Sequence, residues 1–173
     1  MSSEVSELID VFPTLADLAG LPPPDGVDGS SLVPALLRAS GGAAPPPHAG
    51  AFALSVYPRC PADLSNSSNF WRDNDCLYTE RTQIAIMGLS IRVENWRYSE
   101  WRWWLPSLSP DWARSPVGVE LYTHEGDEGD ITTYDEFEVI NLAGQPQFAE
   151  VEAALSAQLR AAYDAASSAP SRL

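Results

Sequence analysis

The sequence predicts an α+β fold: a small antiparallel four-stranded sheet with a C-terminal covering helix, preceded by two short helices. Four short runs of β-branched and aromatic residues occur without the intervening helices that a parallel sheet requires. The last segment instead repeats apolar residues at helical spacing: Phe148, Val151, Leu155, Leu159 and Ala162. The chain has 173 residues, enough for one core or for the closing part of a larger domain.

The first helix is predicted over about residues 11–19. Asp10 as N-cap places Pro13 in the first turn, where a missing N–H leaves no broken hydrogen bond. Gly20, followed by three prolines, is the expected C-terminal stop.

A second helix, residues 32–38, would be capped by Ser30 or Ser31. Residues 39–50, rich in Ala, Gly and Pro, form a predicted linker. Isolated helices this short are marginal in water. We therefore expect both helices to pack on a structure that this chain lacks.

The four strands are predicted at about residues 51–57, 84–93, 97–105 and 117–123. Glu94-Asn95 separates the middle pair, and Asn tolerates positive φ, so these two strands form a hairpin. Residues 58–82 and the acidic, Gly-rich residues 124–135 are predicted loops. The covering helix is predicted over residues 147–164.

Charge and composition exclude several functions. The net charge is −14, which argues against a nucleic-acid partner. All ten basic residues are arginine, so chemistry that depends on lysine is excluded. No apolar run approaches 18 residues, so no membrane span is predicted, and the first ten residues do not resemble a signal peptide.

Cys60 and Cys76 leave two interpretations open. They could close a loop as a disulfide, or remain free thiols in a reducing compartment. The loop between them contains Asn66-Ser67-Ser68, a match to the N-glycosylation sequon, which favours a secreted or lumenal protein. A metal site is not expected, because no second Cys or His pair lies nearby.

Several segments resemble the sulfatase family. Residues 10–21, DVFPTLADLAGL, and 26–32, GVDGSSL, resemble a passage near the end of the sulfatase catalytic domain. Residues 55–59, SVYPR, and 86–101, from IMGLSIR to WRYSEW, are similar to the C-terminal subdomain of iduronate-2-sulfatases.

The closing motifs of the family also have counterparts. Glu120-Leu121-Tyr122 and the later segment Glu138 to Ala143, EVINLA, are similar to them, although Thr123 stands where the family has Asp. Together the similar segments cover about residues 4–163 in the family's order.

The resemblance implies a domain division and an activity. Residues 1–38 would be the tail of an alkaline-phosphatase-like α/β catalytic domain, 51–166 the C-terminal subdomain, and 167–173 a disordered tail. Full-length members hydrolyse sulfate esters, here of glycosaminoglycan-type sugars, in the lysosome or outside the cell. They use calcium and a formylglycine made from Cys in Cys-x-Pro-Ser-Arg.

That machinery is missing from this chain. Neither cysteine begins Cys-x-Pro-Ser-Arg, lysine is absent, and no Asp-Asp pair precedes an arginine. Residues 168–172, SAPSR, match the serine form of the motif, but we interpret this match as coincidence in an Ala/Pro/Ser-rich tail. We therefore expect no cofactor and no turnover in this chain alone, and its partner to be the missing catalytic domain.

Four residues are candidates for contact with a sulfated sugar: Tyr57, Arg59, Trp101 and His124. Arginine makes bidentate contacts with anionic groups, and Trp rings stack on sugars. The competing interpretations are structural: Arg59 pairs with an acidic residue, and Trp101, with Trp103 and Trp104, belongs to the core. His124 could donate a proton or could be solvated.

Three further points concern charged residues and the whole chain. Arg92 and Arg97 flank the turn and are expected to pair across the hairpin with Glu94 or Glu100, the alternative being contact with substrate. The acidic loop lacks the EF-hand spacing, so a solvated turn is favoured over a calcium site. The alternative function is a stand-alone carbohydrate- or protein-binding module with an aromatic sheet face.

Overall fold

The computed structural model describes residues 4–22, 25–44, 51–60, 76–127, 129, 132 and 136–168. The helices are α1 (Val11–Leu18), α2 (Val33–Ala39) and α3 (Ala149–Ser168), and the strands are β1 (Ala53–Arg59), β2 (Ile86–Val93), β3 (Trp96–Leu105), β4 (Ser109–Pro110) and β5 (Gly118–Thr123). Short 3-10 turns lie at Leu8–Asp10, Arg81–Gln83 and Pro146–Phe148. The predicted α+β class is confirmed; the two-residue β4 was not predicted.

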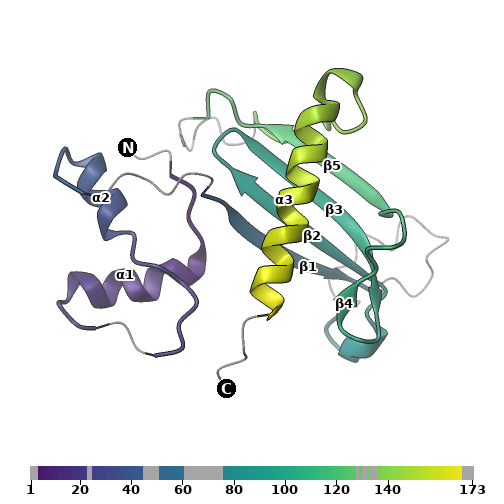
Figure 1. Ribbon diagram of the computed structural model, residues 1–173, viewed down its shortest axis with the longest axis horizontal. Coiled ribbons are helices and arrows are strands. Elements are labelled where there is room, and N and C mark those ends of the chain that lie inside the picture. Colours follow the sequence, from purple (N-terminus) through teal and green to yellow (C-terminus); the bar gives the residue numbers. More distant parts are fainter. Residues whose placement is uncertain are drawn as a thin grey trace.

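The sheet is antiparallel, with β1, β2 and β3 in order and β5 on the other side of β3. The β2–β3 hairpin closes at the pair Val93–Trp96, around the predicted Glu94-Asn95 turn. Helix α3 crosses one face of the sheet, and α1 and α2 lie to the side of β1 (Figure 1).

The core lies between α3 and the sheet. Alternate residues on the strands and one stripe of the helix meet there: Met87, Leu89, Ile91, Tyr98, Leu121, Leu155 and Leu159. Burying such a side chain contributes about 1.5–3 kcal/mol. Because these residues come from β2, β3, β5 and α3, the sheet and its covering helix form one packed unit.

One charged residue lies inside this core. Glu100 is only 1% exposed. Its carboxylate accepts hydrogen bonds from Tyr98 Oη at 2.7 Å and from Ser156 Oγ on α3 at 2.6 Å, and it pairs with Arg102. Burial, together with this carboxylate, raises the pKa of the Tyr98 hydroxyl. The buried charge is therefore fully hydrogen-bonded, as such groups must be.

The outer edge of β5 is covered by a short segment that mimics a strand. Asn141 accepts the Leu121 N–H through Oδ1 and donates through Nδ2 to the Val119 carbonyl, both at 3.0 Å. The Leu142 N–H then donates to the Leu121 carbonyl at 2.8 Å. These bonds satisfy edge groups that would otherwise be free to pair with another chain.

The N-terminal helices have their own polar frame. Helix α1 ends as predicted, at Gly20 with φ of 69°, and the Leu21 N–H bonds to the Ala16 carbonyl. The predicted side-chain cap is wrong, because the Asp10 carboxylate instead accepts the N–H groups of Glu7 and Ser30. The extra 3-10 turn turns that carboxylate away from the first turn of α1.

The second helix begins later than predicted. Leu32 is its N-cap, and Ser31 Oγ accepts the Val33 N–H at 3.2 Å. Helix α3 reaches Ser168, so the first part of the predicted tail is helical. Residues 45–50 of the predicted linker and 169–173 of the tail lie outside the described residues.

Candidate functional site

The face of the sheet opposite α3 carries three of the four candidate residues. Tyr57 of β1 pairs with Gly88 of β2, Gly88 pairs with Trp101 of β3, and Trp101 pairs with Gly118 of β5. Residues paired in this way project from the same face. Arg59 lies two positions beyond Tyr57 and shares that face.

The indole of Trp101 lies flat on the strands beside it. A Cβ placed on Gly88 would come within 2.7 Å of Trp101 Cζ3, whereas one on Gly118 would lie 3.5 Å from Cδ1. Trp101 Nε1 donates to Glu120 Oε1 at 2.7 Å. The ring is therefore fixed in orientation and needs a glycine beneath it on β2.

Arg59 stacks on two aromatic rings. Its Cζ lies 4.8 Å from the Tyr57 ring centroid and 5.3 Å from that of Trp101. Cation–π contacts of this kind hold the plane of the guanidinium against the two rings. Tyr57 is 45% exposed, so part of this surface is open to solvent.

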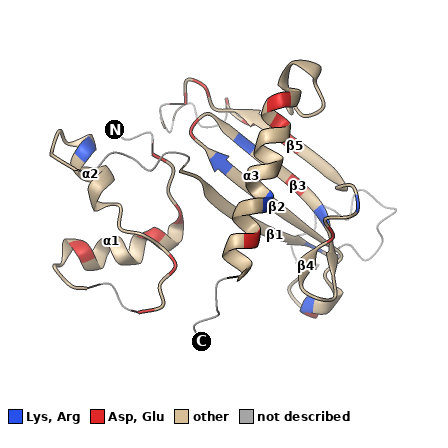
Figure 2. Ribbon diagram, in the orientation of Figure 1, with Lys and Arg blue, Asp and Glu red and all other residues tan. Residues whose placement is uncertain are grey.

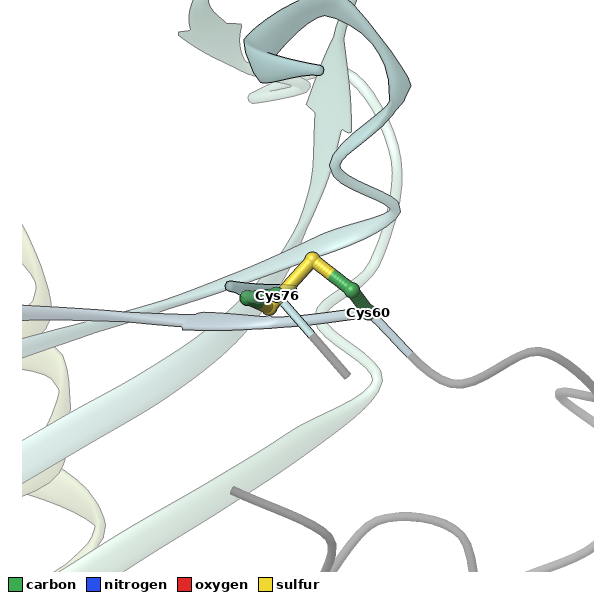
Figure 3. Close-up of a disulfide and its surroundings, with 2 residues drawn as sticks. All are labelled: Cys60 and Cys76. Carbon is green, nitrogen blue, oxygen red and sulfur yellow. A yellow bond between two sulfur atoms is a disulfide. The ribbon is translucent and has the colours of Figure 1, made fainter. Parts of the chain in front are cut away.

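A disulfide fixes the end of β1 next to Arg59. The structure joins Cys60 and Cys76, with the Cα atoms 5.1 Å apart (Figure 3). Of the two interpretations left open by the sequence, the structure adopts the disulfide. It anchors the strand immediately after the stacked arginine.

The three tryptophans of β3 do not form one wall. Trp103 lies on the same face as Trp101, with Arg114 Cζ 3.9 Å from its ring centroid. Trp104 projects to the helix side, where its ring lies edge-on to Tyr163 with centroids 6.5 Å apart. Trp104 therefore belongs to the core side, as the structural interpretation expected, whereas Trp101 and Trp103 lie on the opposite face, because alternation along a strand separates neighbouring residues.

His124 lies away from the other candidates. It follows β5 next to the β2–β3 turn, where its backbone N–H donates to the Asn95 carbonyl. Trp96, beside that turn, pairs with the last residue of β5, whereas Trp101 pairs with the first residue of β5, at the far end of the two strands. The predicted solvated histidine is wrong: His124 is 8% exposed, and both ring nitrogens contact carboxylates. The structure therefore does not bring His124 together with Arg59.

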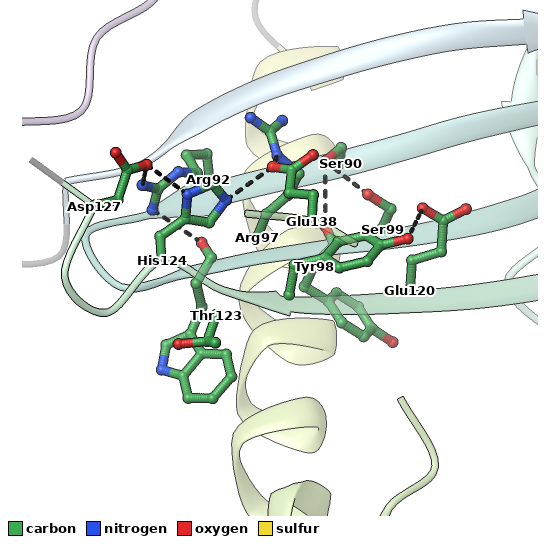
Figure 4. A network of polar contacts seen from close by, with 12 residues as sticks. Ser90, Arg92, Arg97, Tyr98, Ser99, Glu120, Thr123, His124, Asp127 and Glu138 are labelled. Carbon is green, nitrogen blue, oxygen red and sulfur yellow. Dashed lines mark hydrogen bonds and ion pairs between the residues drawn. The ribbon is translucent and has the colours of Figure 1, made fainter. Parts of the chain in front are cut away.

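Arg92 and Arg97 have partners that the sequence did not suggest. Arg97 pairs with Glu138, and Arg92 Nη2 lies 3.9 Å from Asp127 (Figure 4). Arg92 also donates to the backbone carbonyl of Glu94, not to its carboxylate. The expected cross-strand pairs with Glu94 and Glu100 are wrong, because both arginines form ion pairs with acidic residues that follow β5.

Glu120 is the residue that the sequence analysis missed. It holds Trp101, and it accepts a hydrogen bond from Tyr122 Oη at 3.2 Å. Burial, followed by the charge of Glu120, raises the pKa of Tyr122 to about 12. The only signal in the sequence is its alternation with Tyr122 along β5, which places both on the open face.

The arginines of the described chain are concentrated on the sheet. Most arginines of the described chain gather on the sheet and its connections (Figure 2): Arg59, Arg81, Arg92, Arg97, Arg102 and Arg114. Within the described residues, no three Cys, His, Asp or Glu side chains are grouped to hold a metal ion. None of the helices described is both long and apolar enough to cross a membrane.

Comparison with known proteins gives one informative sequence match. No family model matches the chain. A segment of 58 residues is 45% identical to arylsulfatase K of Danio rerio, covering 34% of this chain and 11% of that protein. Over this segment, the chain is similar to a sulfatase.

One solved structure is similar in fold. A Bacteroides thetaiotaomicron protein that is named a sulfatase superposes with a TM-score of 0.50 at 24% identity, covering 87% of this chain and 23% of that protein. A second protein, solved with its substrate D-glucosamine-2-N,6-O-disulfate, gives 0.48 at 17% identity over 94% of this chain and 25% of its own length. The chain thus spans a quarter or less of the length of each of these three proteins.

Proposed function

We propose that this chain is the C-terminal portion of a sulfuric ester hydrolase resembling iduronate-2-sulfatase, acting on glycosaminoglycan-type sugars. The observation that carries the proposal is the 58-residue segment 45% identical to an arylsulfatase. The iduronate-2-sulfatase branch rests on the motifs around β1 and the β2–β3 hairpin. The stacked Arg59, with Tyr57 and Trp101, is the part of the chain proposed to contact an anionic sugar.

The exposed apolar face of the N-terminal helix is an argument for a partner domain outside this chain. Leu8, Val11, Leu15 and Leu18 are spaced three or four residues apart, with Phe12 beside Val11; in sequence order the five are 90%, 47%, 56%, 59% and 62% exposed. Side chains with this spacing share one face of a helix. An apolar stripe of this kind usually marks an interface. The proposed occupant is the catalytic region of the same polypeptide.

The residues of this chain do not fit the catalytic groups of the family. Cys60 and Cys76 are joined in a disulfide, so neither thiol is available for conversion to formylglycine. The sequence contains no lysine to bind the sulfate group. The nucleophile and the calcium site are therefore assigned to the missing region, and this chain is proposed to shape one side of the pocket.

The disulfide also favours an oxidising cellular compartment. Disulfides persist in oxidising compartments and are rare in the cytosol. A lysosomal or secreted enzyme is consistent with the Cys60–Cys76 bond.

The first test is an assay of the purified 173-residue chain on an aryl sulfate with calcium. We expect no turnover, and measurable hydrolysis would refute the assignment of catalysis to another region. The second test is the genomic sequence upstream of Met1. An open reading frame that encodes Cys-x-Pro-Ser-Arg is expected, and its absence would contradict the proposal.

A glycan array on the isolated chain tests the alternative of a stand-alone module. Sugar binding without a catalytic region would favour the module. In an extended, active protein, Arg59→Ala is expected to raise KM for an acidic sugar substrate, with Arg81→Ala as the matched control on the 3-10 turn. Equal KM values for the two variants would remove Arg59 from the proposed pocket.

A further inference from the structure

A cavity lies on the helix-covered side of the sheet, where α3 begins. Its volume is about 310 Å³, and the residues that line it include Tyr98, Pro146, Ala149, Glu152, Ala153 and Ser156. Ligand pockets usually measure about 300–1,000 Å³, so this one suits a small molecule. Tyr98 and Trp101 are three residues apart on β3 and project from opposite faces. The cavity is therefore separate from the surface around Trp101.

Two hydroxyl groups of this cavity have already spent their protons. Tyr98 Oη donates to Glu100 Oε1 at 2.7 Å, and Ser156 Oγ donates to the same oxygen at 2.6 Å. Arg102 pairs with the other oxygen of that carboxylate. Because a hydroxyl carries a single proton, both hydroxyl oxygens can only accept a further hydrogen bond.

Glu152 adds a negative charge beside these hydroxyls. Residues four apart on a helix are neighbours on one face, which places Glu152 next to Ser156. Burial and Glu100 are the main causes that raise the pKa of the Tyr98 hydroxyl, and Glu152 is a further one. Glu152 Oε2 accepts the Gly144 N–H at 2.8 Å, which fixes the carboxylate at the cavity wall. None of the ion pairs formed within the described part of the chain includes Glu152.

The segment that leads into α3 offers the cavity few hydrogen-bond donors. The Gly144 N–H is taken by Glu152. The Gln145 N–H donates to the Leu142 carbonyl at 3.3 Å, and Pro146 has no N–H. Among the lining side chains of the described chain, the amide nitrogen of Gln145 is the remaining donor. Acceptors and negative charge therefore dominate the polar part of the cavity.

We propose that this cavity binds the primary ammonium group of a small organic cation. An ammonium group has three N–H donors, and the lining provides three acceptors for them: Glu152, Tyr98 Oη and Ser156 Oγ. The carbon chain of the ligand lies against the apolar wall formed by Pro146 and Ala153. A carboxylate or sulfate would meet the like charge of Glu152. The cavity thus selects the opposite charge from the sugar-contacting surface proposed on the other face, and it does not depend on that proposal.

Three probes of one size test the charge preference: n-propylammonium, propionate and 1-propanol. Each is titrated into the isotope-labelled 173-residue protein at about pH 7, where an alkylammonium keeps its proton, and the amide signals of Ala153 and Ser156 are followed by NMR. Propylammonium is expected to give saturable shifts with a Kd on the order of 1 mM, within the limit for so small a ligand. It should bind about tenfold more tightly than either other probe. Equal affinity for propionate or propanol would overturn the proposal, as would shifts that do not saturate.

Two acidic residues of the helix separate the cavity from the general acidity of the chain. Glu150 and Glu152 both lie in the first turn of α3, but Glu150 is exposed and does not line the cavity. Glu152→Gln should weaken binding about tenfold, because it removes the charge while its amide oxygen can still accept the Gly144 N–H. Glu150→Gln should bind as wild type does. Equal losses would show that the net charge of −14 attracts the cation without a specific site, and would overturn the proposal.

Ala153→Leu tests where the ligand lies. Ala153 is exposed on α3, and leucine is a good helix former, so the thermal melt should change little. The larger side chain is expected to fill the cavity and abolish the saturable shift of Ser156. Wild-type affinity in the folded Ala153→Leu variant would overturn the proposal. If this variant melts early, the pair of glutamine variants decides the question.

Discussion

Replacing Gly88 by alanine should displace Trp101 from the sheet. The added Cβ would lie 2.7 Å from Trp101 Cζ3 and 3.0 Å from two other ring carbons. The ring is not free to lift, because Nε1 is hydrogen-bonded to Glu120 and Arg59 stacks over it. Gly118→Ala is a matched control on the opposite side of the same ring, since its Cβ would make an ordinary contact at 3.5 Å.

The expected size of the effect follows from two opposing terms. Forcing an extra methyl group into a packed site costs about 1–3 kcal/mol. An alanine in place of glycine restricts the unfolded chain and returns about 0.4–1 kcal/mol. The net loss in the free energy of unfolding for Gly88→Ala is therefore about 1–2 kcal/mol, or roughly 2–8 °C in Tm for a chain of this size. Gly118→Ala should be neutral or slightly stabilising.

Urea unfolding followed by far-UV circular dichroism measures this difference, with wild type and both variants at the same pH. The midpoint for Gly88→Ala should fall while the slope stays constant. Equal midpoints for the two alanine variants, or a lower midpoint for Gly118→Ala, would refute the flat position of Trp101 over β2.

Three further predictions concern other parts of the chain. Arg102→Met leaves the buried Glu100 carboxylate without its ion partner and should cost about 3–5 kcal/mol, whereas the double variant with Glu100→Gln should recover much of the loss; urea unfolding measures both. The hydrogen bond from His124 is the largest cause that lowers the pKa of Asp127. Ionised Asp127 therefore stabilises the folded state above about pH 4, and this stabilisation is lost as pH falls through the lowered pKa. The difference in free energy of unfolding between wild type and Asp127→Asn should shrink between about pH 7 and pH 3. Phe12→Ser with Leu15→Ser should leave Tm of the isolated chain within about 1 °C but raise its solubility, because both side chains are already exposed; a clear fall in Tm would show that they pack on this chain.

The sequence predicted the main elements because their periodicity is local. The alternation in β2 and β3 and the 3.6-residue spacing in α3 each depend on which face of one element meets the core. The turn at Glu94-Asn95 and the stop at Gly20 follow from backbone preferences of single residues. Strand β4 was missed because two residues carry no periodicity.

The candidate site was only partly predictable. Alternation along β1 and β3 was enough to place Tyr57, Arg59 and Trp101 on one face once the register was known. The partners of Arg92 and Arg97 were not predictable, because Asp127 and Glu138 reach them from a loop that has no periodic pattern.

By itself, then, the sequence determined the class of fold, the order of the strands in the chain, the absence of lysine chemistry and the resemblance that its motifs carry. The tertiary structure decided which arginines stack on aromatic rings, which are neutralised by carboxylates, and that His124 is buried between two acids. The physical reason is that secondary structure follows from neighbours in sequence, whereas the environment of a charge depends on groups that only the folded sheet brings within a few ångströms.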